Sequence, residues 1–187
     1  LFQITDTIGF TLRADSAGIL FACLAALLWI PINFYSIGYM RCNNEHEQTG
    51  YFAAFAICMS SVMGIAMASN LLTFFFFYEL LTIASYPLVL HKRNEEALLA
   101  SRKYLIYTLI SGQLFLAGLV AVYCISGTMD FKAGGFLTTD MAPTWQLQLI
   151  FLIMILAGSV KAAVMPLHGW LPAAMIAPTP VSALLHA

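Results

Sequence analysis

One run of forty residues, 51–90, contains a single charged side chain, that of Glu79, and this run limits the possible folds more than any other feature. A helix of about 20 apolar residues crosses the hydrocarbon core of a bilayer, so the run is long enough to cross twice. Helices suit such a run because they satisfy their backbone amides internally. The run therefore predicts two transmembrane helices, 51–69 and 71–90, joined by a tight turn.

Three further apolar stretches are each long enough for one crossing: 16–40, 104–126 and 146–165. The last of them ends at Pro166, and three more prolines divide the residues that follow. We interpret 167–177 as the continuation of a helix broken at Pro166, and 179–187 as the start of another helix, because proline suits the first helical turn. The expected fold is all-α: a multi-pass membrane helix bundle with five complete transmembrane helices, one of them broken by proline, and the beginning of a sixth.

The composition agrees with a chain that lies mostly in lipid. Hydrophobic residues make up 61% of it and charged residues 9%, against about 45–50% and 25% in soluble domains. So little charge cannot cover a water-soluble surface, which excludes a secreted disulfide scaffold, a disordered tail and most soluble enzymes. The net charge of −1 gives no attraction to phosphate, so nucleic acid is not an expected partner.

The basic residues between the predicted helices favour one orientation. The loop 91–103 holds four of the eight lysines and arginines, and the loop 41–50 on the same side holds Arg41, whereas the opposite side holds Arg13 and Lys132. Because cytoplasmic loops are enriched in basic residues, we expect both loops to be cytoplasmic. The chain starts without methionine and ends inside an apolar run, so we expect it to be a piece of a longer protein.

Two charged side chains, Glu79 and Lys161, lie inside predicted spans, where a charge is costly unless it is paired or neutralised. Helical spacing places Thr82 and Tyr86 on the same face as Glu79. A buried glutamate can gain a proton and a buried lysine can lose one, so such a pair can pass protons between water-filled paths. Two alternatives remain: the pair only locks two helices together, or Lys161 extends toward an interface.

The predicted break at Pro166 lies about one turn after Lys161. Proline lacks an amide hydrogen and its ring clashes with the carbonyl four residues back, that of Ala162. Freed backbone groups at membrane depth are tolerated where protein or a water-filled cavity satisfies them. We therefore expect water to reach Lys161 from one side, through a gap bordered by Pro166 and His168.

Two histidines follow the break. His168 lies next but one to Trp170, and His186 lies on the last predicted helix. Both suit a proton relay because imidazole titrates near neutral pH. Two other interpretations stay open: His168 is an interfacial residue beside Trp170, or His168 and His186 hold a haem in a membrane oxidoreductase.

The other histidines and the cysteines show no ligand pattern. His46 and His91 lie in predicted loops and are expected to be solvated. The four cysteines include no CxxC pair and three lie in apolar runs, so we interpret them as buried thiols. We expect neither a bound metal nor a cofactor.

Three segments resemble one family. Residues 77–88 (FYELLTIASYPL) are similar to the glutamate-bearing helix of the antiporter-like family, which comprises the large proton-pumping membrane subunits of respiratory complex I and of Mrp-type multisubunit cation/proton antiporters. Residues 161–172 (KAAVMPLHGWLP) resemble its lysine-bearing broken helix, and residues 177–187 (APTPVSALLHA) resemble the segment leading into its next helix.

The resemblance implies a fold and residue roles. The family fold is built from two inverted repeats, of which this chain would hold the third to seventh helices and the start of the eighth. Carried over to this sequence, Glu79 is the gating glutamate, Lys161 the pumping lysine and His186 the histidine of the following helix. His168 matches the histidine of the Mrp-like branch. Many complex I members have aspartate where this chain has Ala173, so the sequence of this segment is closer to the Mrp and hydrogenase-associated branches.

The resulting hypothesis is a proton-translocating subunit of a multisubunit complex in a prokaryotic cell membrane, gated by Glu79 and Lys161 with His168 and His186 as an onward relay. The expected partners are other membrane subunits, lipid and protons, alone or in exchange for Na⁺ or K⁺. The chain would not be an enzyme by itself, but would belong to the translocase part of a larger complex if its parent is a NADH:quinone oxidoreductase or a membrane hydrogenase. The alternatives are a pump subunit of complex I and a scaffold subunit without transport.

Overall fold

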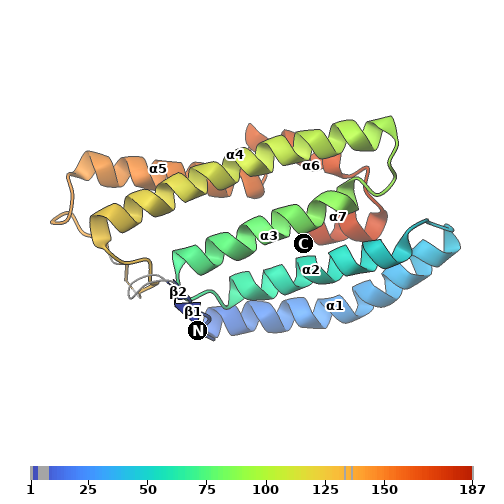
Figure 1. Cartoon of the computed structure of the whole chain (residues 1–187), viewed down its shortest axis with the longest axis horizontal. Coiled ribbons are helices and arrows are strands. Elements are labelled where there is room, and N and C mark those ends of the chain that lie inside the picture. The colour runs from blue at the N-terminus through green and yellow to red at the C-terminus, as the bar shows by residue number, and fades with distance from the viewer. Residues whose placement is uncertain (1, 4–8, 133, 136, 187) are drawn as a thin grey trace.

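The computed structural model of the chain describes residues 2–3, 9–132, 134–135 and 137–186, with side chains for all of these except 2–3 and 184–186. Five helices are long and apolar enough to cross a membrane: α1 (Ser16–Cys42), α2 (Gln48–Ala66), α3 (Leu71–Val89), α4 (Glu95–Ser126) and α5 (Thr144–Lys161). They run roughly alongside one another in an elongated bundle (Figure 1). The predicted all-α membrane bundle with five crossings is confirmed.

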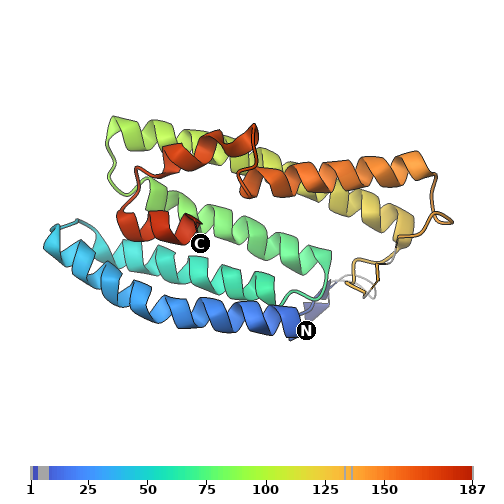
Figure 2. The same ribbon diagram turned by 180° about the vertical axis from the view of Figure 1, so that it is seen from behind.

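Short elements occupy the two ends of the chain. Near the N-terminus, β1 (Phe2–Gln3) pairs with β2 (Gly9–Phe10) in an antiparallel ribbon. After α5 come the 3₁₀ turn η1 (Leu167–Gly169) and two short helices, α6 (Trp170–Ala174) and α7 (Thr179–His186). Seen from behind, this last segment folds back across the bundle, so that α7 lies beside the long helices rather than beyond them (Figure 2).

Polar side chains cap the starts of α1, α3 and α4. Asp15, Asn70 and Asn94 each accept a hydrogen bond from the backbone amide three residues later, at 2.7–2.8 Å, which satisfies donors that a helix start leaves free. The Asn94 cap explains why α4 begins at Glu95, earlier than the predicted start at 104. Its first turns are polar and extend past the apolar stretch, so hydropathy alone does not locate them.

The predicted end of the fifth crossing, at residue 165 before Pro166, is wrong. Helix α5 ends at Lys161, and Ala163 has a left-handed backbone with φ 51°. The amide of Val164 donates to the carbonyl of Ser159, and that of Ala163 to the carbonyl of Val160, the pattern of a Schellman helix end. The chain therefore leaves the helix before the ring of Pro166 would meet the carbonyl of Ala162.

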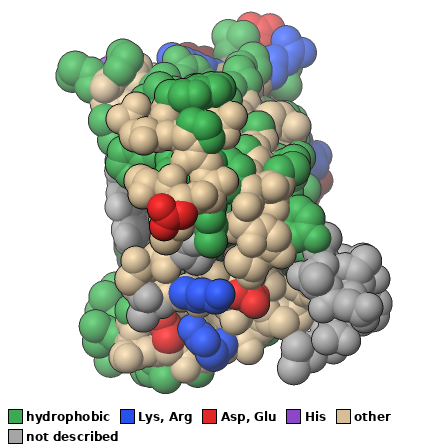
Figure 3. Space-filling model, turned by 90° about the vertical axis from the view of Figure 1, so that its left-hand side faces the viewer, with side chains coloured by type: hydrophobic (Ala, Val, Ile, Leu, Met, Phe, Trp, Pro, Cys, Tyr) green, Lys and Arg blue, Asp and Glu red, His purple; other side chains and the backbone are tan. Residues whose placement is uncertain are grey.

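The loops gather at opposite ends of the bundle. The α1–α2 and α3–α4 loops lie at one end and contact each other through Arg93 and Glu47, which confirms that they share a side. The other end holds the N-terminal ribbon, the α2–α3 turn and the loop after α4. There, Asn70 and Asp130 form an isolated antiparallel β-bridge. Viewed from that second end, the surface shows a few charged side chains between larger hydrophobic and uncharged areas (Figure 3).

Helix α3 packs between α2 and α4, and α5 packs on α4. Two glycines lie under side chains of a neighbouring helix: Phe77 covers Gly64, and Met154 covers Gly118, as small residues do in membrane bundles. Helix α1 packs on α2 and leaves most of its apolar side chains exposed. These would contact lipid or other helices.

The prediction that the cysteines are buried holds only for Cys58. Cys23, Cys42 and Cys124 are exposed on the described surface. An apolar run shows that a helix crosses the membrane but does not show which of its faces points inward, because the lipid-facing side is apolar too.

Candidate functional site

The ammonium of Lys161, in the last turn of α5, reaches across to α3. Its Nζ donates a hydrogen bond to Oγ1 of Thr82 at 2.8 Å, and it lies 4.8 Å from the ring centroid of Tyr78, within cation–π range. Thr82 is fully buried. The structure thus brings Lys161 to the polar face of α3 that also carries Glu79, which lies three residues before Thr82.

A hydrogen-bonded network fixes this part of α3 relative to α4 and α5. The Thr82 hydroxyl donates to the carbonyl of Tyr78 at 3.2 Å, which leaves its lone pairs to accept from Lys161. The Tyr78 hydroxyl lies 2.5 Å from Oγ of Ser111, and Ser111 donates to the carbonyl of Ala157 at 2.8 Å. Three helices are therefore joined by polar contacts within one turn of the lysine.

The carboxylate of Glu79 lies against Gly112 of α4, where a Cβ atom would overlap it. Its Oε1 is buried and has no hydrogen-bond partner among the described residues. Within the described part of the chain, the contacts closer than 4.0 Å between basic and acidic side chains are those of His91 with Glu45, which is an ion pair only when the imidazole is protonated, and of Arg93 with Glu47. Glu79 and Lys161 therefore occupy one region without touching. A buried polar atom without a partner is uncommon and needs an explanation.

A cavity of about 210 Å³ adjoins Lys161. Its lining comes from α2, α3, α4, α5, α6 and α7, and includes Cys58, Ser85, Tyr104, Lys161, Trp170 and Val181. The cavity is much larger than the roughly 10–15 Å³ that one water needs, and its hydroxyl and ammonium groups can hydrogen-bond to water. The lysine therefore has a space through which a proton can arrive or leave.

Trp170, the first residue of α6, lines this cavity. Its indole nitrogen donates to the carbonyl of Val160 at 2.7 Å, and its ring packs on Tyr104. The Val160 carbonyl, in the last turn of α5, therefore accepts two hydrogen bonds, from this indole and from the amide of Ala163. The break is thus held by a side chain as well as by its own backbone.

The predicted relay residues do not all reach the cavity. His168 is exposed on η1 and does not line it, and Pro166 is exposed just before η1. The side chain of His186 lies outside the described residues. No group of three or more metal-ligating side chains occurs among the described residues.

Several site residues could not be singled out from the sequence. Tyr104, Thr108 and Ser111 are all buried, and their spacing of four and three places them on one face of α4. Ser85 of α3 lies 2.5 Å from the hydroxyl of Tyr104. The sequence shows these polar residues in an apolar helix, but small hydroxyl side chains are common in membrane helices. Their presence alone therefore does not indicate a functional site.

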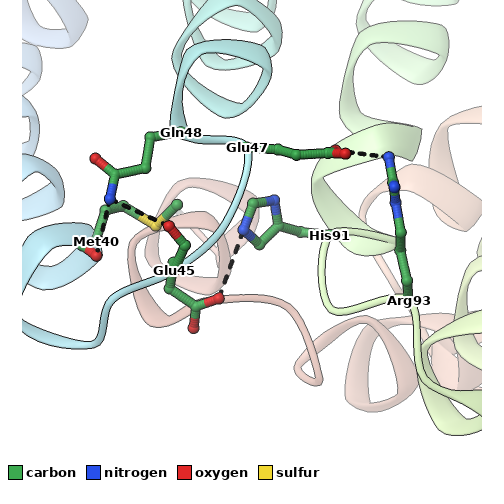
Figure 4. Close-up of polar contacts among 6 residues, drawn as sticks. All are labelled: Met40, Glu45, Glu47, Gln48, His91 and Arg93. Atoms are coloured by element: carbon green, nitrogen blue, oxygen red, sulfur yellow. Dashed lines mark hydrogen bonds and ion pairs between the residues drawn. The ribbon is translucent and has the colours of Figure 1, made fainter.

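A second polar cluster lies at the end of the bundle that holds the α1–α2 and α3–α4 loops, called the loop end below (Figure 4). Nε2 of His91 is 3.6 Å from Oε2 of Glu45, and Arg93 contacts Glu47 at 2.6 Å. The His91 side chain is only 8% exposed, so the expectation that it is solvated is wrong. Burial lowers the pKa of His91, and the carboxylates of Glu45 and Glu47 offset this only in part.

Comparisons with known proteins agree with this architecture. Residues 68–187 match the family described as NADH:quinone oxidoreductase/Mrp antiporter, TM. One relative, a Na⁺/H⁺ antiporter subunit from Alkalihalophilus pseudofirmus, is 32% identical over 181 residues, which cover 96% of this chain and 22% of the relative. The NAD(P)H-quinone oxidoreductase subunit 5 of Paulinella chromatophora is 29% identical, with 94% and 27% covered. This chain therefore spans about a quarter of these relatives.

Two solved structures share the fold. A chain of the membrane-bound sulfane sulfur reductase, an archaeal respiratory membrane complex, superposes with a TM-score of 0.85 at 25% identity, over 96% of this chain and 36% of the other. A chain of the Mrp complex from Dietzia sp. gives a TM-score of 0.66 at 25% identity, over 73% and 15%. The resemblance noted in the sequence is confirmed, and the chain belongs to the NADH:quinone oxidoreductase/Mrp antiporter family of transmembrane subunits.

Proposed function

We propose that this chain is the proton-transferring part of a membrane subunit, with Lys161 as the proton carrier and Glu79 as its charge partner. One observation supports this most strongly. The ammonium of Lys161 borders a cavity and is bound by a neutral hydroxyl, while Oε1 of the half-buried Glu79 is itself buried and has no hydrogen-bond partner among the described residues. A purely structural ion pair would be expected to be closed.

The chemistry follows from the charges. An approaching carboxylate stabilises the ammonium form of a lysine, and its withdrawal favours release of the proton. Alternate approach and withdrawal of Glu79 would therefore load and unload Lys161, with cavity water as donor or acceptor. The driving step would come from partner subunits or a cation gradient, and His168 and His186 would carry the proton onward once both face the same path.

The relatives indicate the setting of this activity. They are named as subunits of Na⁺/H⁺ antiporters and of a quinone oxidoreductase, and the matching structures are membrane complexes. We therefore propose other membrane subunits as partners, and protons, alone or exchanged for Na⁺ or K⁺, as the transported ions.

Proton transport by the full-length protein, assembled in its complex and reconstituted in vesicles, tests the role of Lys161. We expect Lys161→Ala to lower transport by about 100-fold, the typical contribution of a proton-transferring side chain. Lys92→Ala, which removes an exposed loop lysine, should transport at the parental rate. Both variants should assemble into the complex.

A scaffold role is the second candidate, because the Lys161–Thr82 bond joins α5 to α3 whether or not protons move. Parental transport by an assembled Lys161→Ala complex would leave only this role.

A further inference from the structure

Glu79 and Lys161 each lie against a residue of another helix. Thr82 holds the lysine, through the 2.8 Å hydrogen bond to its Nζ. Gly112 accommodates the glutamate, because its missing Cβ leaves room for the carboxylate against the backbone of α4. The two neighbours lie on different helices, so each can be changed separately.

Thr82 offers the ammonium an alternative to the carboxylate. Its hydroxyl proton is used on the carbonyl of Tyr78, so its oxygen faces Lys161 as an acceptor. The side chain is fully buried, which fixes its position. Because the acceptor is neutral, it orients the ammonium without holding the proton as strongly as a carboxylate would.

Gly112 affects the position of the Glu79 carboxylate through the space that its missing side chain leaves. Glu79 Oε1 makes no hydrogen bond with the described residues, so it is the space at Gly112 rather than a bond at this atom that lets the carboxylate sit there. Any residue larger than glycine would push the carboxylate out of this position.

We propose that Thr82 and Gly112 are positioning residues that keep Lys161 and Glu79 parted in one of the states of the transport cycle. This rests on the proposed function. Without either neighbour, the two charges would close into an ion pair that retains the proton, and transport would slow.

The first test replaces Thr82 in the full-length complex and measures proton transport in vesicles. Thr82→Val keeps the shape but removes the acceptor, and we expect transport to fall roughly tenfold, as for the loss of a hydrogen bond to a charged group. Thr82→Ser restores the hydroxyl and should restore transport to within about twofold of the parent. In a Glu79→Gln background, Thr82→Val should cause no further loss, because no carboxylate remains to capture the ammonium.

The second test uses two glycines of α4. Gly112→Ala should lower transport in the parent but not in the Glu79→Gln background, where the displaced amide cannot form an ion pair. Gly118→Ala is the matched control, because its added Cβ would meet the flexible side chain of Met154 and no charge. It should leave transport unchanged.

The outcomes separate this proposal from the proposed function. If Glu79→Gln transports protons like the parent, the proposed role of Glu79 fails. If Glu79→Gln is impaired but Thr82→Val and Gly112→Ala transport normally, only the positioning role fails. Equal losses from Thr82→Val in both backgrounds would also overturn it, since they would indicate a packing role independent of Glu79.

Discussion

The two polar regions of this molecule treat their charges differently. At the loop end, Arg93 and Glu47 meet at 2.6 Å although their side chains are 68% and 60% exposed. In the bundle interior, Lys161 binds a threonine hydroxyl and Glu79 has an unpartnered oxygen. An exposed pair contributes little to stability, whereas an interior charge without its partner is costly. The charges whose separation costs most are therefore the ones kept apart, as the proposed proton transfer requires and a purely structural contact between helices would not.

The interior network should matter for stability as well as for position. Ser111→Ala removes the contact to Tyr78 and the bond to the Ala157 carbonyl, and we expect the free energy of unfolding to fall by about 1 kcal/mol, a typical size for such bonds between membrane helices. Denaturant unfolding in detergent measures this. Ser101→Ala is the control, because the bond that this hydroxyl makes with the described residues, to the carbonyl of Leu98, lies within its own helix. An equal effect of both variants would show that Ser111 does not join the helices.

The loop end should respond to pH. Burial lowers the pKa of His91 below its ordinary value despite the carboxylates of Glu45 and Glu47, with Arg93 and Lys92 acting in the same direction as burial. The unfolded chain therefore binds a proton at His91 at higher pH than the folded chain does. The contribution of neutral His91 to the free energy of unfolding is fully present above its ordinary pKa of about 6.5, and it decreases as the pH falls from there toward the lower pKa of the folded chain.

Melting curves at several pH values, in the parent and in His91→Gln, test this prediction. Below about pH 6.5, the melting temperature should fall less in the variant than in the parent. An identical pH dependence in the two proteins would show that His91 is not the group responsible.

Much of the fold and part of the candidate site can be predicted from the sequence. Apolar runs long enough to cross a bilayer predicted the five long helices, and charges inside those runs pointed to Glu79 and Lys161. The end of α5 was missed because alanine, rather than glycine, takes the left-handed position at Ala163. The Glu79–Gly112 contact depends on how α3 and α4 are aligned, which the residues of neither helix reveal alone. The burial of His91 likewise depends on two loops that meet only in the folded bundle.

The same substitution in the two regions tests the central claim most directly. Glu79→Gln and Glu47→Gln each remove one carboxylate charge, and proton transport by both assembled full-length complexes would be measured in the same vesicles. We predict that Glu79→Gln lowers transport by roughly tenfold or more, as for the loss of one member of an interacting charge pair. Glu47→Gln should transport at the parental rate, because its ion pair is exposed and weak. Parental transport by Glu79→Gln, or equal losses in both variants, would contradict the proposed role of the parted interior charges.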